Sequence, residues 1–206
     1  MKNYLVEFIG TFFLVFVIGL ASDPLAIGSV LMVMVYMGGH ISGAHYNPAV
    51  TLAVMMRGKT TRSEAGKYML AQLLGALAAA IMAYFILGHT FAPAPGPSTS
   101  LIKALFIEIA FTFALASVVL NVATSKKTAG NSFYGLAIGF TVFVGATAGG
   151  GISGGAYNPA VGTGPILFAS LIGQGSLQYL WIYLVGPFAG GAIAALVFRY
   201  LNPDDL

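Results

Sequence analysis

The segment ISGAHYNPAV, residues 41–50, recurs as ISGGAYNPAV at residues 152–161, with eight identities in ten positions and an offset of 111 residues. In each copy Asn-Pro opens a short apolar run, over 47–56 and 158–169. Asparagine is a good N-cap, and proline is favourable at the first position of a helix. One Asn-Pro could be an ordinary loop turn, but two copies inside long repeats predict a pair of short helices.

The remaining sequence indicates a membrane protein. Hydrophobic residues make up 58% of the 206 residues and charged residues 7%, whereas soluble domains carry roughly 25% charged residues. The apolar runs at the two repeats are too short to span a bilayer, which takes about 20 residues. Six other segments have that length: 4–21, 25–40, 66–88, 101–123, 132–150 and 178–200. We predict an all-α membrane protein of six transmembrane helices and two re-entrant half-helices.

The sequence lacks the residues that several functional classes require. There is no cysteine, and the histidines at 40, 45 and 89 do not form a metal-ligand pattern. We find no nucleophile–base pair either, so no enzyme activity, catalytic residue, cofactor or metal is expected. The sequence pI of 9.2 does not indicate nucleic-acid binding, because the basic residues cluster beside apolar segments.

The basic residues predict the orientation in the bilayer. With the N-terminus in the cytoplasm, eight of the nine basic residues lie inside: Lys2, Arg57, Lys59, Arg62, Lys67, Lys126, Lys127 and Arg199. Positive charge gathers in cytoplasmic loops, so both termini should be cytoplasmic. The first apolar run contains Glu7 and is followed by further spans, so we expect a retained helix rather than a signal peptide.

The repeat predicts one channel domain, 1–206, made of two half-repeats, 1–100 and 101–206. Upstream of the motifs, Glu7 and Thr11 correspond to Glu108 and Thr112, each pair four residues apart. Each half holds three spans, and an odd number gives the halves opposite orientations. Inverted repeats of this kind place their functional site at the membrane midplane, where the halves meet.

The chemistry of the motifs suggests what passes through this site. The residues at its centre are Asn47, Pro48, Ala49, Asn158, Pro159 and Ala160. In inverted halves the two helix N-termini face one another, and their partial positive charges repel cations. If the asparagine amides face the lumen, they donate hydrogen bonds to a neutral molecule. The glycine-rich segments before them are tolerated at this depth only where buried or lining a wet cavity. Their carbonyls, from Gly43, Ala44, His45, Gly154 and Ala156, should line the pore.

With both Asn-Pro-Ala motifs, the chain resembles the aquaporin and glycerol-facilitator family, the major intrinsic proteins. The resemblance extends to Glu-x-x-x-Thr-Phe at the start of each half, AQLLGA at 71–76 and WIYLVGP at 181–187. It implies a right-handed helical bundle with a pore in each protomer, a homotetramer, and a place in the cell membrane. It also implies that Glu7 and Glu108 brace the glycine-rich loops, and that His45 does the same.

One position departs from the family pattern. Most relatives have arginine after the second Asn-Pro-Ala, where this chain has Val161. Alignment on the motifs gives Ile27, Ala146 and Gly155 as the other residues of the outer constriction. This ring carries no charge or side-chain donor, and its small members should widen it. We therefore expect a less selective filter that passes water and small neutral solutes; glycerol, urea, ammonia and metalloid acids all remain open.

Two other functions remain possible from the residues alone. Inverted repeats and membrane-embedded acids such as Glu7 and Glu108 also occur in coupled secondary transporters, where such acids relay protons. Saturable, proton-dependent flux that is abolished by Glu7→Gln would indicate a transporter. A membrane scaffold with an occluded pore would make vesicles no more permeable than empty ones.

Overall fold

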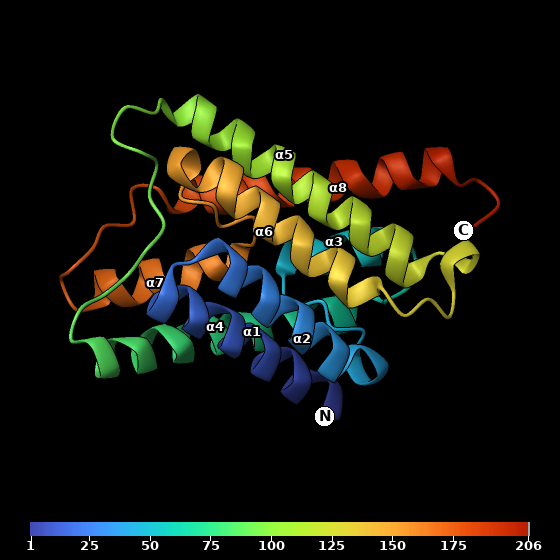
Figure 1. Cartoon of the computed structure of the whole chain (residues 1–206), viewed down its shortest axis with the longest axis horizontal. Helices are drawn as coiled ribbons and strands as arrows, with labels where there is room; N and C mark the ends of the chain where they lie inside the picture. Colours follow the sequence, from blue (N-terminus) through green and yellow to red (C-terminus); the bar gives the residue numbers. More distant parts are fainter. Residues whose placement is uncertain (206) are drawn as a thin grey trace.

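The computed structural model describes residues 1–205, and within that range it is helical with no strand (Figure 1). Its α-helices are α1 (Lys2–Ala21), α2 (Pro24–Ser42), α3 (Pro48–Met56), α4 (Arg62–Leu87), α5 (Leu101–Val119), α6 (Tyr134–Ser153), α7 (Pro159–Leu171) and α8 (Leu180–Leu201). Six helices are long and apolar enough to cross a membrane, and α3 and α7 are shorter. The predicted all-α architecture of six spans and two half-helices is confirmed.

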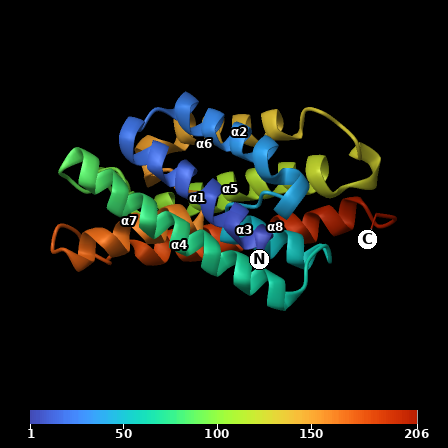
Figure 2. The same ribbon diagram turned by 90° about the horizontal axis from the view of Figure 1, so that it is seen from below.

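The two halves pack by the same pattern. In the first half α1 lies along α4, in the second α5 lies along α8, and α2 meets α6 where the halves join (Figure 2). Gly28 and Gly139, 111 residues apart, touch at this junction. A Cβ on either would lie 2.7 or 2.4 Å from the carbonyl oxygen of the other, which is closer than real contacts allow. The absence of a side chain at both positions lets α2 and α6 approach backbone to backbone.

The observed ends of the helices are set by capping residues more than by the ends of the apolar runs. Helix α4 begins at Arg62, four residues before the expected start, because the Thr61 side chain accepts a hydrogen bond from the Glu64 N–H at 3.2 Å. Beyond α5 the chain continues through a π-helical turn, η1 (Leu120–Thr124), and a 3₁₀ turn, η2 (Lys126–Thr128). The spans thus extend past their apolar runs into polar turns.

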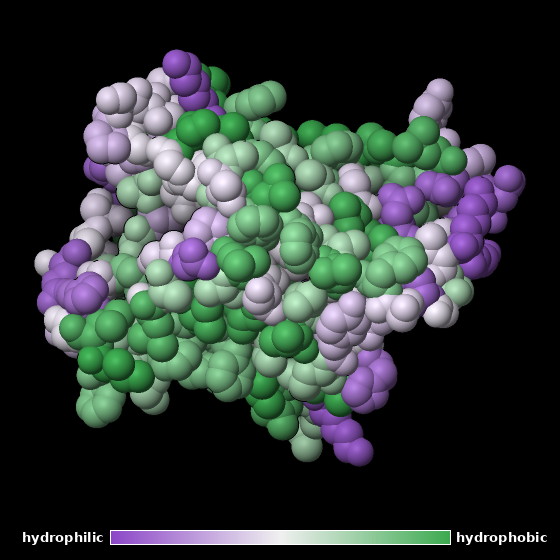
Figure 3. Space-filling view, viewed as in Figure 1, coloured by the Kyte–Doolittle hydropathy of each residue, from purple (hydrophilic) through white to green (hydrophobic). Residues whose placement is uncertain are grey.

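The outer surface is suited to lipid. Large apolar side chains such as Phe85 and Phe106 are 82% and 67% exposed. Hydrophobic residues cover the middle of the face shown in Figure 3, and hydrophilic residues gather mainly at its two ends. Buried polar side chains, in contrast, lie inside the bundle. This arrangement is the reverse of a soluble protein's surface and is typical of a chain surrounded by hydrocarbon.

A buried ion pair joins three distant segments at one end of the bundle, called here the basic-end clasp (Arg57, Ser125, Lys126 and Asp205). Asp205 accepts hydrogen bonds from Arg57 Nη2 at 3.0 Å, Ser125 Oγ at 2.6 Å and the Lys126 N–H at 3.0 Å. The Ser125 hydrogen bond, above all, keeps the pKa of Asp205 below its usual range, aided by Lys126 and by the Arg57 charge. The clasp holds the end of α3, the α5–α6 connection and the C-terminal segment together.

Candidate functional site: a pore at the meeting of two half-helices

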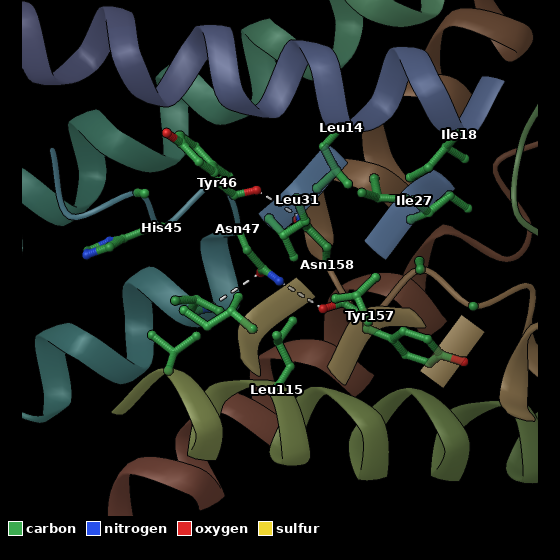
Figure 4. A pocket seen from close by; sticks show the side chains of 18 residues that line it. Leu14, Ile18, Ile27, Leu31, His45, Tyr46, Asn47, Leu115, Tyr157 and Asn158 are labelled. Carbon is green, nitrogen blue, oxygen red and sulfur yellow. Dashed lines mark hydrogen bonds between the residues drawn. The ribbon is translucent and has the colours of Figure 1, made fainter. Parts of the chain in front are cut away.

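The two asparagines of the repeats cap their half-helices and bond across the midplane. Asn47 Oδ1 accepts from the Ala49 N–H at 2.8 Å, and Asn158 Oδ1 accepts from the Ala160 N–H at 2.9 Å. Their amide nitrogens reach the opposite half: Asn47 Nδ2 donates to the Tyr157 carbonyl and Asn158 Nδ2 to the Tyr46 carbonyl, each at 2.9 Å (Figure 4). The N-termini of α3 and α7 are thereby fixed face to face.

This exchange limits what each asparagine offers to a permeant. The amide oxygen is engaged by the helix cap, and one amide hydrogen is engaged by the opposite loop. An asparagine amide has two donor hydrogens. One N–H of Asn47 and one of Asn158 therefore remain, and both residues line the central cavity. The pair presents donors, not acceptors, to a molecule at the midplane.

The loop before Asn47 is braced by the carboxylate of Glu7, which is fully buried on α1. Oε1 accepts from Ser42 Oγ at 2.7 Å and from the His45 N–H at 3.0 Å, while Oε2 accepts from the Tyr46 N–H at 2.7 Å. Gln72 Nε2 adds a fourth bond to Oε2 at 2.8 Å. Charged acceptors form the stronger hydrogen bonds, so this carboxylate is a firm anchor for the loop.

Glu108 occupies the same place in the second half. Its Oε1 accepts from Ser153 Oγ at 2.7 Å and the Ala156 N–H at 3.0 Å, and its Oε2 accepts from the Tyr157 N–H at 2.7 Å. It is also fully buried on its own helix, α5. The two acids that the resemblance assigned to loop bracing thus each contact the loop of their own half.

The loops carry matched backbone strain. Tyr46 and Tyr157 have backbone φ angles of 48° and 49°, a left-handed conformation that residues other than glycine rarely adopt. Both tyrosine hydroxyls are anchored, to the Met34 carbonyl at 2.9 Å and to the Gly145 carbonyl at 2.8 Å. Such strain persists only where the surroundings hold it, and it concentrates at functional sites. Here it lets each N–H meet a glutamate just before the half-helix begins.

A central cavity of about 30 Å³, enough for about one water molecule, is lined by the two asparagines together with three of the expected filter residues. Apart from the two asparagines and loop residues 44–46 and 155–157, its lining is aliphatic: Leu14, Ile18, Ile27, Leu31, Val50, Leu115, Val119, Ile138, Val142 and Val161. Among the described residues, none of those lining it is an Asp, Glu, Lys or Arg.

The central cavity lies between two wider vestibules. The loop-end vestibule, about 350 Å³, is bordered by residues 91–93 and by the turn at Ser22 and Pro24. The basic-end vestibule, about 520 Å³, includes Lys59, Glu64 and Tyr68. Together the three spaces describe a route that widens toward both ends and is narrowest near its middle.

The expected pore residues divide among these spaces. Ile27, Gly155 and Val161 line both the central cavity and the loop-end vestibule, while Ala146 lines only that vestibule. Of the expected carbonyl residues, Ala44, His45 and Ala156 line the central cavity. Gly43 lies in the basic-end vestibule and Gly154 in the loop-end vestibule.

Sequence reasoning missed the side chains that support the loops from behind. Gln72 bridges Glu7 and Thr51 Oγ1, and the latter also contacts His45 Nδ1 at 3.1 Å. Tyr183 donates a hydrogen bond to the Ser153 carbonyl from the corresponding place in the second half. Gln72 and Tyr183 are 111 residues apart, the same offset as the motifs, and this numerical signal was available in the sequence.

Six spans, two half-helices joined at their N-termini and an uncharged passage between vestibules define a membrane channel for small uncharged molecules. The family model for the major intrinsic proteins matches residues 1–198, and the chain belongs to that family. The architecture and the function expected from the motifs are those of a passive channel, in agreement with this membership.

Individual relatives agree over nearly the whole chain. Aquaporin NIP1-4 from Oryza sativa is 37% identical over 98% of this chain and 77% of its own length. Glycerol uptake facilitator protein-like 6 from Lactiplantibacillus plantarum is 36% identical over 100% of both chains. The X-ray structure of the aquaglyceroporin from Plasmodium falciparum superposes with a TM-score of 0.87 at 25% identity, covering 98% of this chain and 97% of that one.

Proposed function

We propose that this channel conducts water together with small uncharged solutes and excludes ions. The observation that carries the proposal is the lining of the central cavity: aliphatic side chains, loop backbone and two asparagines, with no charged side chain among the described lining residues. An ion would have to leave water for this surface, at a cost of several kcal/mol or more. A neutral molecule loses far less on entering.

The midplane supplies a second barrier to cations. Asn47 and Asn158 join the N-termini of α3 and α7, where unpaired N–H groups and the helix dipoles concentrate partial positive charge. A water or alcohol oxygen accepts from the free N–H of each asparagine, whereas a cation at the same point faces the positive end of those N–H dipoles. Exclusion of cations therefore rests on the half-helices, since the filter position at Val161 lacks a fixed charge.

Size and polarity at the filter set the order of permeation. Ile27 and Val161 provide apolar walls and Gly155 provides backbone, so this end of the cavity has no side-chain donor. Water and ammonia fit a cavity of about 30 Å³, and urea, glycerol and metalloid acids enter by displacing the aliphatic side chains. We expect water permeability to be low to moderate, because the ring offers water no side-chain hydrogen bond.

The orientation and assembly follow from the same reasoning. The basic-end vestibule faces the cytoplasm of a cell membrane with both termini, because Lys59 lines it and the neighbouring segments 57–64 and 124–131 carry most of the other basic residues. The channel works as a homotetramer with a pore in each protomer. The strongly exposed aromatic side chains of Phe85 and Phe106 leave apolar surface for neighbouring protomers or lipid to cover.

Stopped-flow light scattering on proteoliposomes tests the proposal with water, ammonia, urea and glycerol. Flux should rise linearly with concentration and be indifferent to a proton gradient. Val161→Arg should lower urea and glycerol flux more than water flux, because a cation and its bulk narrow the ring. Val161→Leu serves as the control that adds bulk without charge.

The alternatives give different results in the same assay. Saturable flux that requires a proton gradient and is lost in Glu7→Gln would replace the channel by a coupled transporter. Vesicles no more permeable than empty ones to every solute would indicate a scaffold. Conductance of K⁺ comparable to that of neutral solutes would contradict the proposed barrier at Asn47 and Asn158.

A further inference from the structure

The central cavity and the loop-end vestibule share four lining residues: Ile18, Ile27, Gly155 and Val161. Residues common to two adjoining cavities surround the passage between them. Gly155 contributes no side chain, so the side chains around this passage are those of Ile18, Ile27 and Val161. We propose that Ile18 of α1 is a size-determining residue of the filter, in the place where Ala146 was expected.

The face of α1 that carries Ile18 is the pore face of the helix. Leu14 lies four residues earlier, so both side chains project from one side of the helix, and Leu14 lines the central cavity. Glu7 and Thr11, which continue this face toward the N-terminus, are fully buried. Figure 4 shows Ile18 beside Ile27 at one end of the cavity, with Leu14 and Leu31 further in.

A tight turn fixes Ile18 relative to Ile27. The Ile18 carbonyl accepts from both the N–H and the hydroxyl of Ser22, at 3.2 and 3.0 Å, which closes the end of α1. The next residue, Asp23, caps α2 through the Ala26 N–H at 2.8 Å, and its carbonyl accepts from the Ile27 N–H at 3.0 Å. One short connection therefore sets the spacing of the two isoleucines.

The loop over residues 88–100 holds this end of α1 from the other side. The Phe91 ring lies against Gly19, where an added Cβ would be 2.4 Å from the ring. Phe91 and Ile18 both line the loop-end vestibule. Because α1 is held between the turn and the loop, and because isoleucine is stiff at χ1, the Ile18 side chain forms a fixed wall rather than a flexible one.

Ile18 therefore controls how large a solute the passage admits, an inference that rests on the proposed channel function. Ile18→Ala removes most of one wall and should raise the ratio of glycerol to water permeability. A single methylene in an apolar site already changes discrimination by about 10-fold or more, so we expect a change of about 10-fold. Ile18→Val should give an intermediate ratio, and Ile18→Phe should lower glycerol flux more than water flux.

Two matched controls separate the filter from general effects. Leu20→Ala makes the same kind of truncation on α1, at a side chain that is 41% exposed on the outer surface, and should leave the ratio unchanged. Ala146→Leu adds bulk in the vestibule alone, and should reduce glycerol flux less than Ile18→Phe does. Permeabilities of all variants are measured in proteoliposomes of equal protein content, after the folded state is checked by thermal unfolding in detergent.

The outcomes distinguish this inference from the function on which it rests. If the native protein conducts neutral solutes but the glycerol-to-water ratio stays the same in folded Ile18→Ala and Ile18→Val, Ile18 does not determine size and only the inference fails. If the native protein conducts none of the solutes, both fail. A ratio that changes equally in Leu20→Ala would likewise overturn the assignment, since it would trace the effect to loosening of α1.

Discussion

The two re-entrant loops are built on equivalent glutamates, but different chemistry supports them from behind. In the first half Glu7 belongs to a hydrogen-bonded network: Gln72 donates to its carboxylate and to Thr51, and His45 contacts Thr51 in turn. Every member is buried. Fully satisfied networks rigidify a site, but within the described residues the buried Gln72 Oε1 has no hydrogen-bond partner.

In the second half the same three positions carry other residues. At an offset of 111, His45, Thr51 and Gln72 correspond to Ala156, Gly162 and Tyr183. The helices approach so closely here that position 162 has no room for a side chain: a Cβ on Gly162 would lie 2.4 Å from the Tyr183 Cβ. Aromatic packing has therefore replaced the polar network. In both halves a glutamate and an asparagine hold the loop, while two different arrangements stand behind them.

Removing the shared glutamates should have the largest effect. Glu7→Ala removes the acceptor of four buried hydrogen bonds, of which only the Gln72 donor keeps a second acceptor in Thr51, and Glu108→Ala removes the acceptor of three. Each unpaired buried donor costs about 1–3 kcal/mol, so both variants should lose several kcal/mol, Glu7→Ala the more. Thermal unfolding in detergent measures the loss, with Asp204→Ala, at an exposed carboxylate, as the control. Equal thermal midpoints for Glu7→Ala and native protein would show that the glutamate does not stabilise the first loop.

Transplanting the first solution into the second half should come next. Gly162→Thr forces a side chain against Tyr183 and should destabilise by about 3 kcal/mol, the upper range for overpacking. Tyr183→Gln rebuilds the first-half pair, but glutamine keeps the Cβ that a side chain at 162 would meet at 2.4 Å. The double variant should therefore stay less stable than native protein by about 3 kcal/mol, as measured by thermal unfolding in detergent. Recovery of native stability in the double variant would show that the bulk of the Tyr183 ring, and not the close approach of the two helices, excludes a side chain at 162.

Loss of the supporting hydrogen bonds should be milder. Gln72→Met keeps the volume but removes the donors to Glu7 and Thr51, and we expect a loss of about 2 kcal/mol. Tyr183→Phe removes only the bond to the Ser153 carbonyl and should cost about 1 kcal/mol. Both are measured by thermal midpoint. The reverse order would mean that the second half depends more on its polar contact than on its packing.

The smallest effect is expected on acidification. The half-helix α3 ends at Arg57 in the basic-end clasp, whereas α7 ends near Ile172, which is 39% exposed. Because the folded pKa of Asp205 is lowered, its contribution is complete above the ordinary carboxyl pKa of about 4 and is lost only as the pH falls through the lowered value. The difference in thermal midpoint between native protein and Asp205→Asn should therefore stay constant from about pH 7 to pH 5. A difference that already shrinks in that range would show that the clasp titrates earlier.

The fold was predictable from two local signals, the repeated Asn-Pro and the length of the apolar runs. Both signals depend on residues near one another in sequence, so they can be recognised without knowing how the helices pack. The start of α4 was misplaced because Thr61 caps it from a polar turn that a hydropathy pattern does not include. The helices themselves were predicted at their correct places.

The site was predictable only in part, for a physical reason. Asn47 and Asn158 carry their own signature, but the part of α1 around Ile18 is apolar on every side. Only Glu7 and Thr11, earlier in the helix, mark the face on which Ile18 lies. The basic-end clasp joins Arg57 to Asp205 across 148 residues, and no local pattern connects them. The available signal that went unused was the 111-residue offset, which pairs Gln72 with Tyr183.

The exchange between Asn47 and Asn158 has a consequence for how the chain is made. Chains are synthesised from the N-terminus, so the first half reaches the bilayer before residue 158 exists. At that stage the Asn47 amide and the Tyr46 carbonyl have no partner, and Gly28 has no Gly139 to pack against. Glu7 can already hold the first re-entrant loop, but the bonds of Asn47 and Tyr46 to the opposite half form only when the second loop arrives. The permeation pathway is therefore completed late in synthesis, and a chain that ends before residue 157 does not yet contain the pore.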